Sequence, residues 1–127
     1  MSVRIPILKL GEVLIASLQA DMTDTDAESF QAALVQRVLG TEAAGVLLDI
    51  SAMEMVDSFM ARVINDTAAS CQMLGAEVVV CGVQPAVAIT LVEMGRGLIG
   101  VRTSFNLEQG LERLRHAMDT RRWGGRP

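Results

Sequence analysis

The stretch GVLLDISAMEMVDSFMARVIND, residues 45–66, passes from the pattern of a buried strand to that of an amphipathic helix. Its first part, GVLLDIS, is a short apolar run of the kind used by strands that are buried on both faces. From Ser58 to Gly75 apolar residues recur at helical spacing on one face, at Met60, Val63, Ile64, Thr67, Cys71 and Leu74. A buried strand that leads into such a helix predicts an α/β unit with a right-handed crossover.

Two strands are expected near the start of the chain. Residues 4–18, RIPILKLGEVLIASL, read as two strands joined at Lys9–Glu12, where Gly11 is available for the turn. Pro6 has no amide proton, so the first strand should lie at an edge of the sheet. That edge, around Arg4–Leu10, is a predicted self-association surface, partly blunted by Pro6 and Lys9.

A helix should follow in residues 23–40, TDTDAESFQAALVQRVLG. Thr25 and Glu28 have the spacing of a capping box, and Gly40 is expected to end the helix. Its buried stripe has i, i+4, i+8 spacing and consists of Phe30, Leu34 and Val38.

The second half of the chain repeats the alternation of strand and helix. Residues 76–83, AEVVVCGV, form a second buried strand, and Pro85 suits the first turn of a helix that Gly95 closes. LIGVRTS, residues 98–104, is a weaker strand candidate. The last helix should open with a capping box at Asn106 and Gln109. Its inward residues are expected to be Leu107, Leu111, Leu114 and Met118.

The predicted order is therefore β-β-α-β-α-β-α-β-α, an α/β fold with a mixed, mostly parallel sheet of about five strands and about four helices. Residues 1–119 are expected to form a single domain, since 127 residues suit one core. Residues 120–127, TRRWGGRP, are expected to be a flexible tail rich in Arg and Gly.

Composition excludes several classes of function. A net charge of −4 argues against general nucleic-acid binding, and three Phe with one Trp and no Tyr offer no stacking platform for a base. Cys71, Cys81 and the single His116 do not have the spacing of a zinc site. No apolar run approaches the ~18 residues of a membrane span, and no secretory signal is visible, so a cytoplasmic protein is expected.

Motifs for catalysis or nucleotide binding are weak. GRGLIG, with Gly95, Gly97 and Gly100, has the letters of a dinucleotide fingerprint, but it follows a predicted helix and precedes a strand, so we interpret it as a turn. His116 lies near the end of the last helix, where the helix dipole accounts for a cation. The acidic run Asp21–Glu28 likewise suits a helix start. We therefore expect no enzyme activity, no metal and no cofactor.

Asp57 and Ser58 stand between the strand and the helix of the opening stretch. Either side chain suits the N-cap, which accepts a hydrogen bond from a free amide of the first turn. The pair should also lie at the edge where the parallel strands end, which is where ligands and partners meet open α/β sheets. The residues alone favour the capping role over a regulatory one.

The element order, with LLDISAMEMVDSFMARVI entering the second helix, resembles the STAS domain of bacterial anti-sigma-factor antagonists. Asp49-Ile50-Ser51 and Asp57-Ser58 hold the places of that family's motifs. The stretches DSFMARVINDTAA and LGAEVVVCGVQPAVAITLVEMG are similar to RsbS-type scaffolds of the bacterial stressosome. Many simple antagonists continue as DSSG where this chain has DSFM, which counts against a simple anti-anti-sigma factor that binds an anti-sigma kinase directly.

The resemblance implies a non-enzymatic scaffold. It implies phosphorylation of Ser58 by an RsbT-type serine kinase, which the unmodified protein would hold and the modified protein release. It also implies assembly with RsbR-type co-antagonists that carry related STAS domains. A phosphate on Ser58 would add roughly −1.5 to −2 charges at a helix N-terminus, which accommodates negative charge.

We predict that the partner surface surrounds Ser58. The residues expected to flank it there are Met53, Met55, Asp57, Phe59 and Met60. The ends of the neighbouring helix are expected to extend this surface through Gln84, Pro85, Glu93 and Met94. Burial explains the apolarity of that helix equally well. A small nucleotide-binding α/β protein is the more distant alternative.

Overall fold

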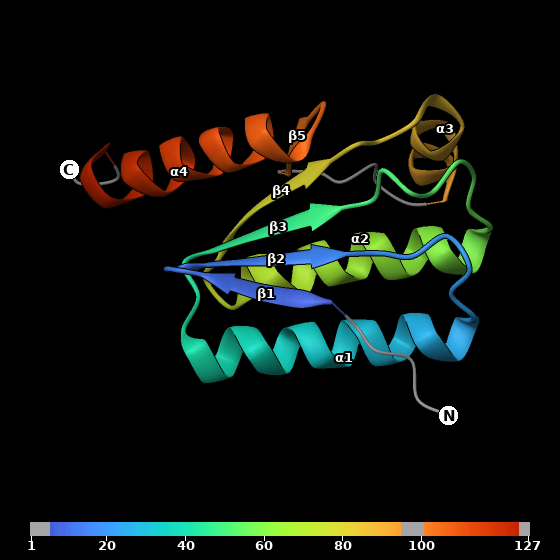
Figure 1. Cartoon of the computed structure of the whole chain (residues 1–127), viewed down its shortest axis with the longest axis horizontal. Coiled ribbons are helices and arrows are strands. Elements are labelled where there is room, and N and C mark those ends of the chain that lie inside the picture. The colour runs from blue at the N-terminus through green and yellow to red at the C-terminus, as the bar shows by residue number, and fades with distance from the viewer. Residues whose placement is uncertain (1–5, 95–100, 125–127) are drawn as a thin grey trace.

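The computed structural model describes residues 6–94 and 101–124. Its elements are β1 (Ile7–Leu10), β2 (Val13–Ser17), α1 (Asp24–Thr41), β3 (Gly45–Asp49), α2 (Ser58–Met73), β4 (Glu77–Cys81), α3 (Pro85–Glu93), β5 (Arg102–Ser104) and α4 (Leu107–Gly124). The predicted order of strands and helices is confirmed (Figure 1). Gly95, Gly97 and Gly100 of the GRGLIG motif lie outside the described residues.

The sheet has the strand order β1-β2-β3-β4-β5. β1 pairs with β2 in antiparallel fashion, and the other neighbours are parallel. Gly11 turns the chain between β1 and β2 with a φ of 61°. β1 is therefore an edge strand, as Pro6 predicts, although in the described residues it begins only at Ile7.

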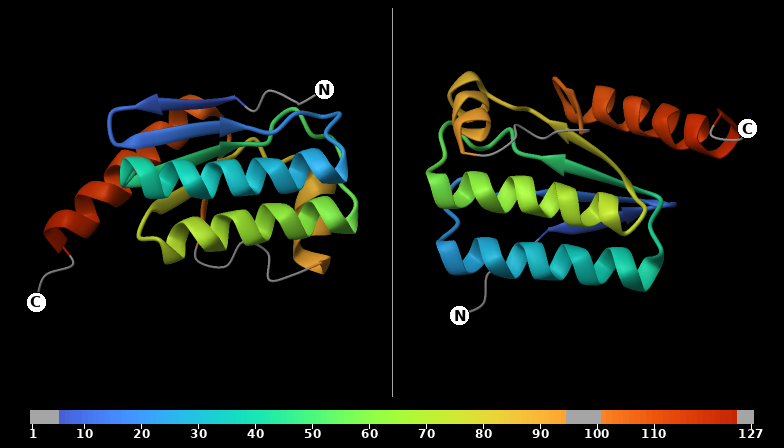
Figure 2. Two further views of the ribbon diagram at one scale, coloured as in Figure 1. Left: turned by 90° about the horizontal axis from the view of Figure 1, so that it is seen from below. Right: turned by 180° about the vertical axis from the view of Figure 1, so that it is seen from behind.

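Helices cover the two faces of the sheet unequally. α1 and α2 lie side by side against one face, and α4 lies against the other (Figures 1 and 2). The larger cluster includes the predicted stripe of Phe30, Leu34 and Val38. The smaller cluster joins Leu114 and Met118 of α4 to the other side of β2, β3 and β4. Leu107 was expected to point inward with them, but it is 39% exposed, because it occupies the first turn of α4.

Two predicted boundaries of the first helix are wrong. α1 is capped by Thr23, whose hydroxyl accepts from the amide of Asp26 at 3.1 Å, while the Asp26 carboxylate accepts from the amide of Thr23 at 3.0 Å. This capping box leaves Thr25 inside the first turn. The helix also passes Gly40 and ends at Thr41, followed by Glu42 in the left-handed conformation.

The C-terminal helix extends past the predicted domain boundary. Residues from 120 were expected to be flexible, but α4 continues to Gly124. Arg121 contacts the carbonyl of Gly75 and lies 3.4 Å from the Glu77 carboxylate, and Arg122 lies 3.2 Å from Glu12. These contacts attach the last turns of α4 to the segments at the amino ends of β2 and β4. The composition of the tail does not predict this attachment.

Candidate functional site

The candidate site lies at the edge of the sheet where its parallel strands end. β2, β3 and β4 end on the same side, and α1, α2 and α3 begin there (Figure 1). The loop between β3 and α2 leads to Ser58, and the loop between β4 and α3 contains Gln84. The topology thus brings both predicted parts of the partner surface to one end of the domain.

Asp57, not Ser58, is the N-cap of α2. Its carboxylate accepts a hydrogen bond of 2.8 Å from the amide of Met60, and its backbone is extended, with φ −87° and ψ 177°. Ser58 is the first residue of the helix, and both side chains are exposed. Because Asp57 performs the capping, the Ser58 hydroxyl is not needed for it.

A set of hydrogen bonds shapes the loop that leads to Ser58. The Asp49 carboxylate accepts from the amide of Ser51 at 3.0 Å and from its hydroxyl at 2.7 Å. The side-chain amide of Gln84 donates to the carbonyl of Ser51 at 2.9 Å. Sequence reasoning identified Gln84 but gave Ser51 no role at the site, because their contact spans 33 residues.

Gly82 fits against the same loop. It has a φ of 77°, and a Cβ atom there would lie 2.5 Å from the Cβ of Ser51. That distance is shorter than real side chains allow, and the left-handed conformation independently favours glycine. Gly82 follows β4 directly. A glycine immediately after a predicted strand is therefore the feature of the sequence that could have indicated this close approach.

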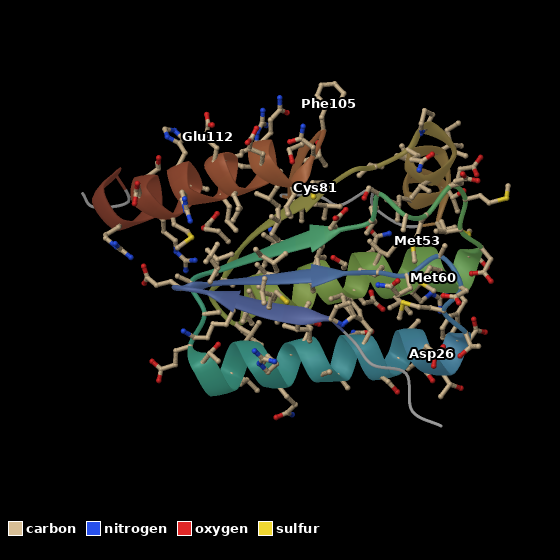
Figure 3. All side chains as sticks on the ribbon, viewed as in Figure 1. Asp26, Met53, Met60, Cys81, Phe105 and Glu112 are labelled. Carbon is tan, nitrogen blue, oxygen red and sulfur yellow. The ribbon has the colours of Figure 1, made fainter. Side chains whose placement is uncertain are left out.

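The apolar residues around Ser58 differ sharply in exposure. Met53 and Met60 are only 3% and 7% exposed and belong to the core, contrary to the expectation that they lie on the surface. Phe59 is half-buried and packs against that core, whereas Met55 is 76% exposed. Figure 3 shows Met53 and Met60 at the same end of the molecule as Asp26 of α1. Only Met55 of this group therefore presents most of its side chain to a partner.

The buried methionines form part of a hollow beside the start of α2. The hollow has a volume of about 380 Å³. Its lining comes from the loop after β2, the start of α1, the loop before α2 and the first turn of α2, namely Ala20, Met22, Asp24, Met53, Met55, Val56, Asp57 and Met60. Ala20 and Met22 escaped sequence reasoning, because only the fold brings the loop between β2 and α1 beside the start of α2.

The neighbouring helix α3 presents an apolar face. It buries Val87 and Leu91, while Ile89 and Val92 are 60% and 66% exposed. Pro85 occupies the first turn of α3, as predicted, and it is exposed, as are Glu93 and Met94 at the other end. Ile89 and Val92 were missed, because the sequence pattern does not distinguish a buried apolar helix from one with a free face.

Two ionisable groups in the described residues, both cysteine thiols, have clearly raised pKa values. Burial raises the pKa of the Cys71 thiol to about 11, and burial together with the nearby Asp49 carboxylate raises that of Cys81 to about 12. Within the described residues no three His, Cys, Asp or Glu side chains gather in a way that could hold a metal ion. No helix in residues 6–94 and 101–124 is long and apolar enough to cross a membrane.

The family model of the STAS domain matches residues 4–105. The chain belongs to the STAS domain family. A solved structure of RsbS from Moorella thermoacetica with the substitution S58E aligns with a TM-score of 0.84 and 36% identity, covering 92% of this chain and 99% of that one. A structure of the stressosome, described as a signal integration and transduction hub, aligns with a TM-score of 0.80 and 38% identity. The alignment covers 88% of this chain and 97% of that one.

Two curated relatives of this STAS domain are RsbT co-antagonist proteins of Bacillus subtilis (strain 168). RsbRA is 26% identical over 108 residues, which are 84% of this chain and 39% of RsbRA. RsbRD is 33% identical over 66 residues, which are 52% of this chain and 24% of RsbRD. The chain thus spans well under half the length of these relatives. The anti-sigma factor antagonist SpoIIAA, 10% identical with a TM-score of 0.68, shares the fold. The predicted fold and family are confirmed.

Proposed function

We propose that this chain is a non-enzymatic scaffold of the RsbS kind, which holds an RsbT-type serine kinase while Ser58 is unmodified and releases it once Ser58 is phosphorylated. It assembles in the cytoplasm with RsbR-type co-antagonists and takes part in control of the general stress response. The observation that carries the proposal is the placement of Ser58, exposed at the first position of α2 and directly after the capping residue Asp57.

Electrostatics support a switch at this serine that leaves the fold intact. A phosphate adds roughly −1.5 to −2 charges, which the amide groups and dipole of a helix N-terminus stabilise. The charge of the phosphate adds to the negative charges of Asp57 and of Glu54, which is exposed in the preceding loop, so the local surface becomes strongly negative. An interface that excludes water would lose affinity under such a charge, because its desolvation is not compensated.

Comparison with relatives supports the choice of partners. Two of the matched proteins are RsbT co-antagonists, and one structural match is the stressosome itself. The RsbS structure carries S58E, an acidic replacement, which fits a protein whose serine responds to negative charge. The sole histidine, His116, lies on α4 against the other face of the sheet, which supports a role without catalysis.

Self-association is proposed to use the edge strand β1. Its outer edge has no partner strand in the described structure, and Leu8 and Leu10 are 63% and 43% exposed. An unpaired edge is a ready template for a second chain.

The test combines phosphorylation with binding. The protein is incubated with its RsbT-type kinase and ATP, and mass spectrometry is expected to find phosphate on Ser58. Ser58→Asp should weaken kinase binding at least about tenfold, because the charge enters the interface. Ser58→Ala should bind the kinase but not be released by ATP.

Ser29 provides a matched control, since it is an exposed serine within α1. Ser29→Asp adds the same charge and is expected to leave kinase affinity unchanged. Phosphate absent from Ser58, or equal binding by the wild type and Ser58→Asp, would contradict the proposed switch.

A further inference from the structure

The methionine-lined hollow is shaped to accept a side chain from outside. Its inner wall is made by Met53 and Met60, which are almost fully buried, and Met22 is half-buried beside them. The side chain of Met22 is positioned by the amide of Gln19, which lies 3.3 Å from its sulfur atom. Methionine is unbranched and polarisable, so a wall of this kind adapts to an inserted apolar group.

The rim of the hollow carries negative charge. Asp24 and Asp57 line it directly, and both are exposed. Asp21 and Glu54 are exposed in the two loops that lead to these residues. In the described part of the chain, the acidic partners of the ion pairs are Glu12 and Glu77. None of these ion pairs therefore neutralises the rim. An apolar floor with an acidic rim is complementary to an apolar side chain flanked by basic residues.

We infer that this hollow receives one apolar side chain, of the size of Leu or Met, from a partner segment that carries Lys or Arg beside it. The inference rests on the proposed function, since it specifies the chemistry by which the RsbT-type kinase docks beside Ser58. Asp24 and Asp57 both line the hollow and Ser58 does not, so the basic residue of the partner is taken to pair with Asp24 and leaves the charge of a phosphate on Ser58 uncompensated. The acidic rim raises the rate of association with such a segment, and this contribution is reduced by salt.

Filling the hollow tests the apolar contact. Ala20 lines the hollow and is exposed, so Ala20→Phe adds bulk there without disturbing the core. Ala69→Phe adds the same bulk on the exposed side of α2 and serves as the control. Ala20→Phe should weaken kinase binding at least about tenfold, whereas Ala69→Phe should stay within about twofold of the wild type.

Methyl resonances of labelled methionine report on the wild-type protein directly. The methyl signals of Met53 and Met60 are expected to shift when the kinase binds. Met73, at the opposite end of α2, and Met118, on the other face of the sheet, should not respond. Asp24→Asn should reduce the association rate and its salt dependence, while Glu112→Gln on α4 should change neither.

The outcomes separate this inference from the proposed function. If the kinase fails to bind the wild type, both are overturned. If the kinase binds, but the signals of Met53 and Met60 stay fixed and Ala20→Phe binds normally, only the hollow is overturned as its docking site. If these signals shift with protein concentration in the absence of kinase, a second copy of the chain is the occupant, and the inference is also overturned.

Discussion

The side-chain amide of Gln84 donates a 2.9 Å hydrogen bond to the backbone carbonyl of Ser51, and so joins the loop before α3 to the loop before α2. Gly82 lies against the same Ser51, at a distance that leaves no room for a Cβ atom. These contacts hold the loop that leads to Ser58 against the loop that leads to α3. A partner that covers Ser58 and α3 together meets a surface that is already organised, which reduces the entropy lost on binding.

Gly82→Ala should be strongly destabilising. The left-handed conformation costs an L-residue roughly 1–2 kcal/mol, and the overlap with Ser51 adds to this, so a loss of at least about 2 kcal/mol is expected in urea unfolding. Gly40→Ala is the matched control, because a Cβ there meets open space within α1. It should gain about 0.5–1 kcal/mol. Equal effects of the two substitutions would contradict the close packing at Gly82.

Asp57→Ala should lower the free energy of unfolding by about 1 kcal/mol, because the amide of Met60 loses its acceptor. Asp57→Asn retains an acceptor oxygen and should stay within a few tenths of a kcal/mol of the wild type, since Asn and Asp cap about equally well. Urea unfolding followed by circular dichroism measures both. If Ser58→Ala proved as costly as Asp57→Ala, the assignment of the cap to Asp57 would be wrong.

The two buried cysteines, Cys71 and Cys81, should lower the free energy of unfolding at alkaline pH. Their folded pKa values of about 11 and 12 lie above the ordinary thiol value, so between about pH 9 and 11 the unfolded chain has released protons that the folded protein retains. The free energy of unfolding is therefore unaffected by these thiols below that range and decreases as the pH rises through it. Urea titrations from pH 7 to 10 test this.

Thiol labelling checks the same burial at fixed pH. At pH 8 a thiol reagent should react with neither cysteine in the native protein and with both, Cys71 and Cys81, in urea. Rapid labelling of the native protein would show that the reagent reaches the thiols more easily than their burial in the structure allows.

Lys9→Pro should reduce self-association without unfolding β1. The amide of Ser17 donates to the carbonyl of Pro6, and hydrogen-bonded pairs alternate along an antiparallel ladder. The backbone groups of Lys9 therefore point to the free edge, whereas those of Leu8 bond to β2. Proline at position 9 removes only an edge amide.

Leu8→Pro is the contrasting variant, since it removes an amide that bonds to β2 and should lower the thermal midpoint. Sedimentation at several concentrations measures the assembly. Unchanged assembly by a folded Lys9→Pro protein would show that the chains associate through another surface.

The fold was largely predictable because its elements have clear periods. Apolar runs at β3 and β4 and the stripe of Phe30, Leu34 and Val38 reflect burial that each element requires on its own. Boundaries were harder where two capping patterns compete, as with Thr23 and Thr25. Capping depends on backbone geometry as well as residue type, so neighbouring candidates look alike in sequence.

The sequence by itself determined the strand-helix alternation and the place of Ser58 at a helix start, because both follow from local spacing and capping chemistry. Tertiary structure alone decided that Met53 and Met60 are buried while Met55 is exposed. It also decided that Met22 joins them in one hollow and that Gln84 reaches Ser51. These contacts join segments far apart in the chain, and their geometry depends on how the helices pack against the sheet, which no local pattern encodes.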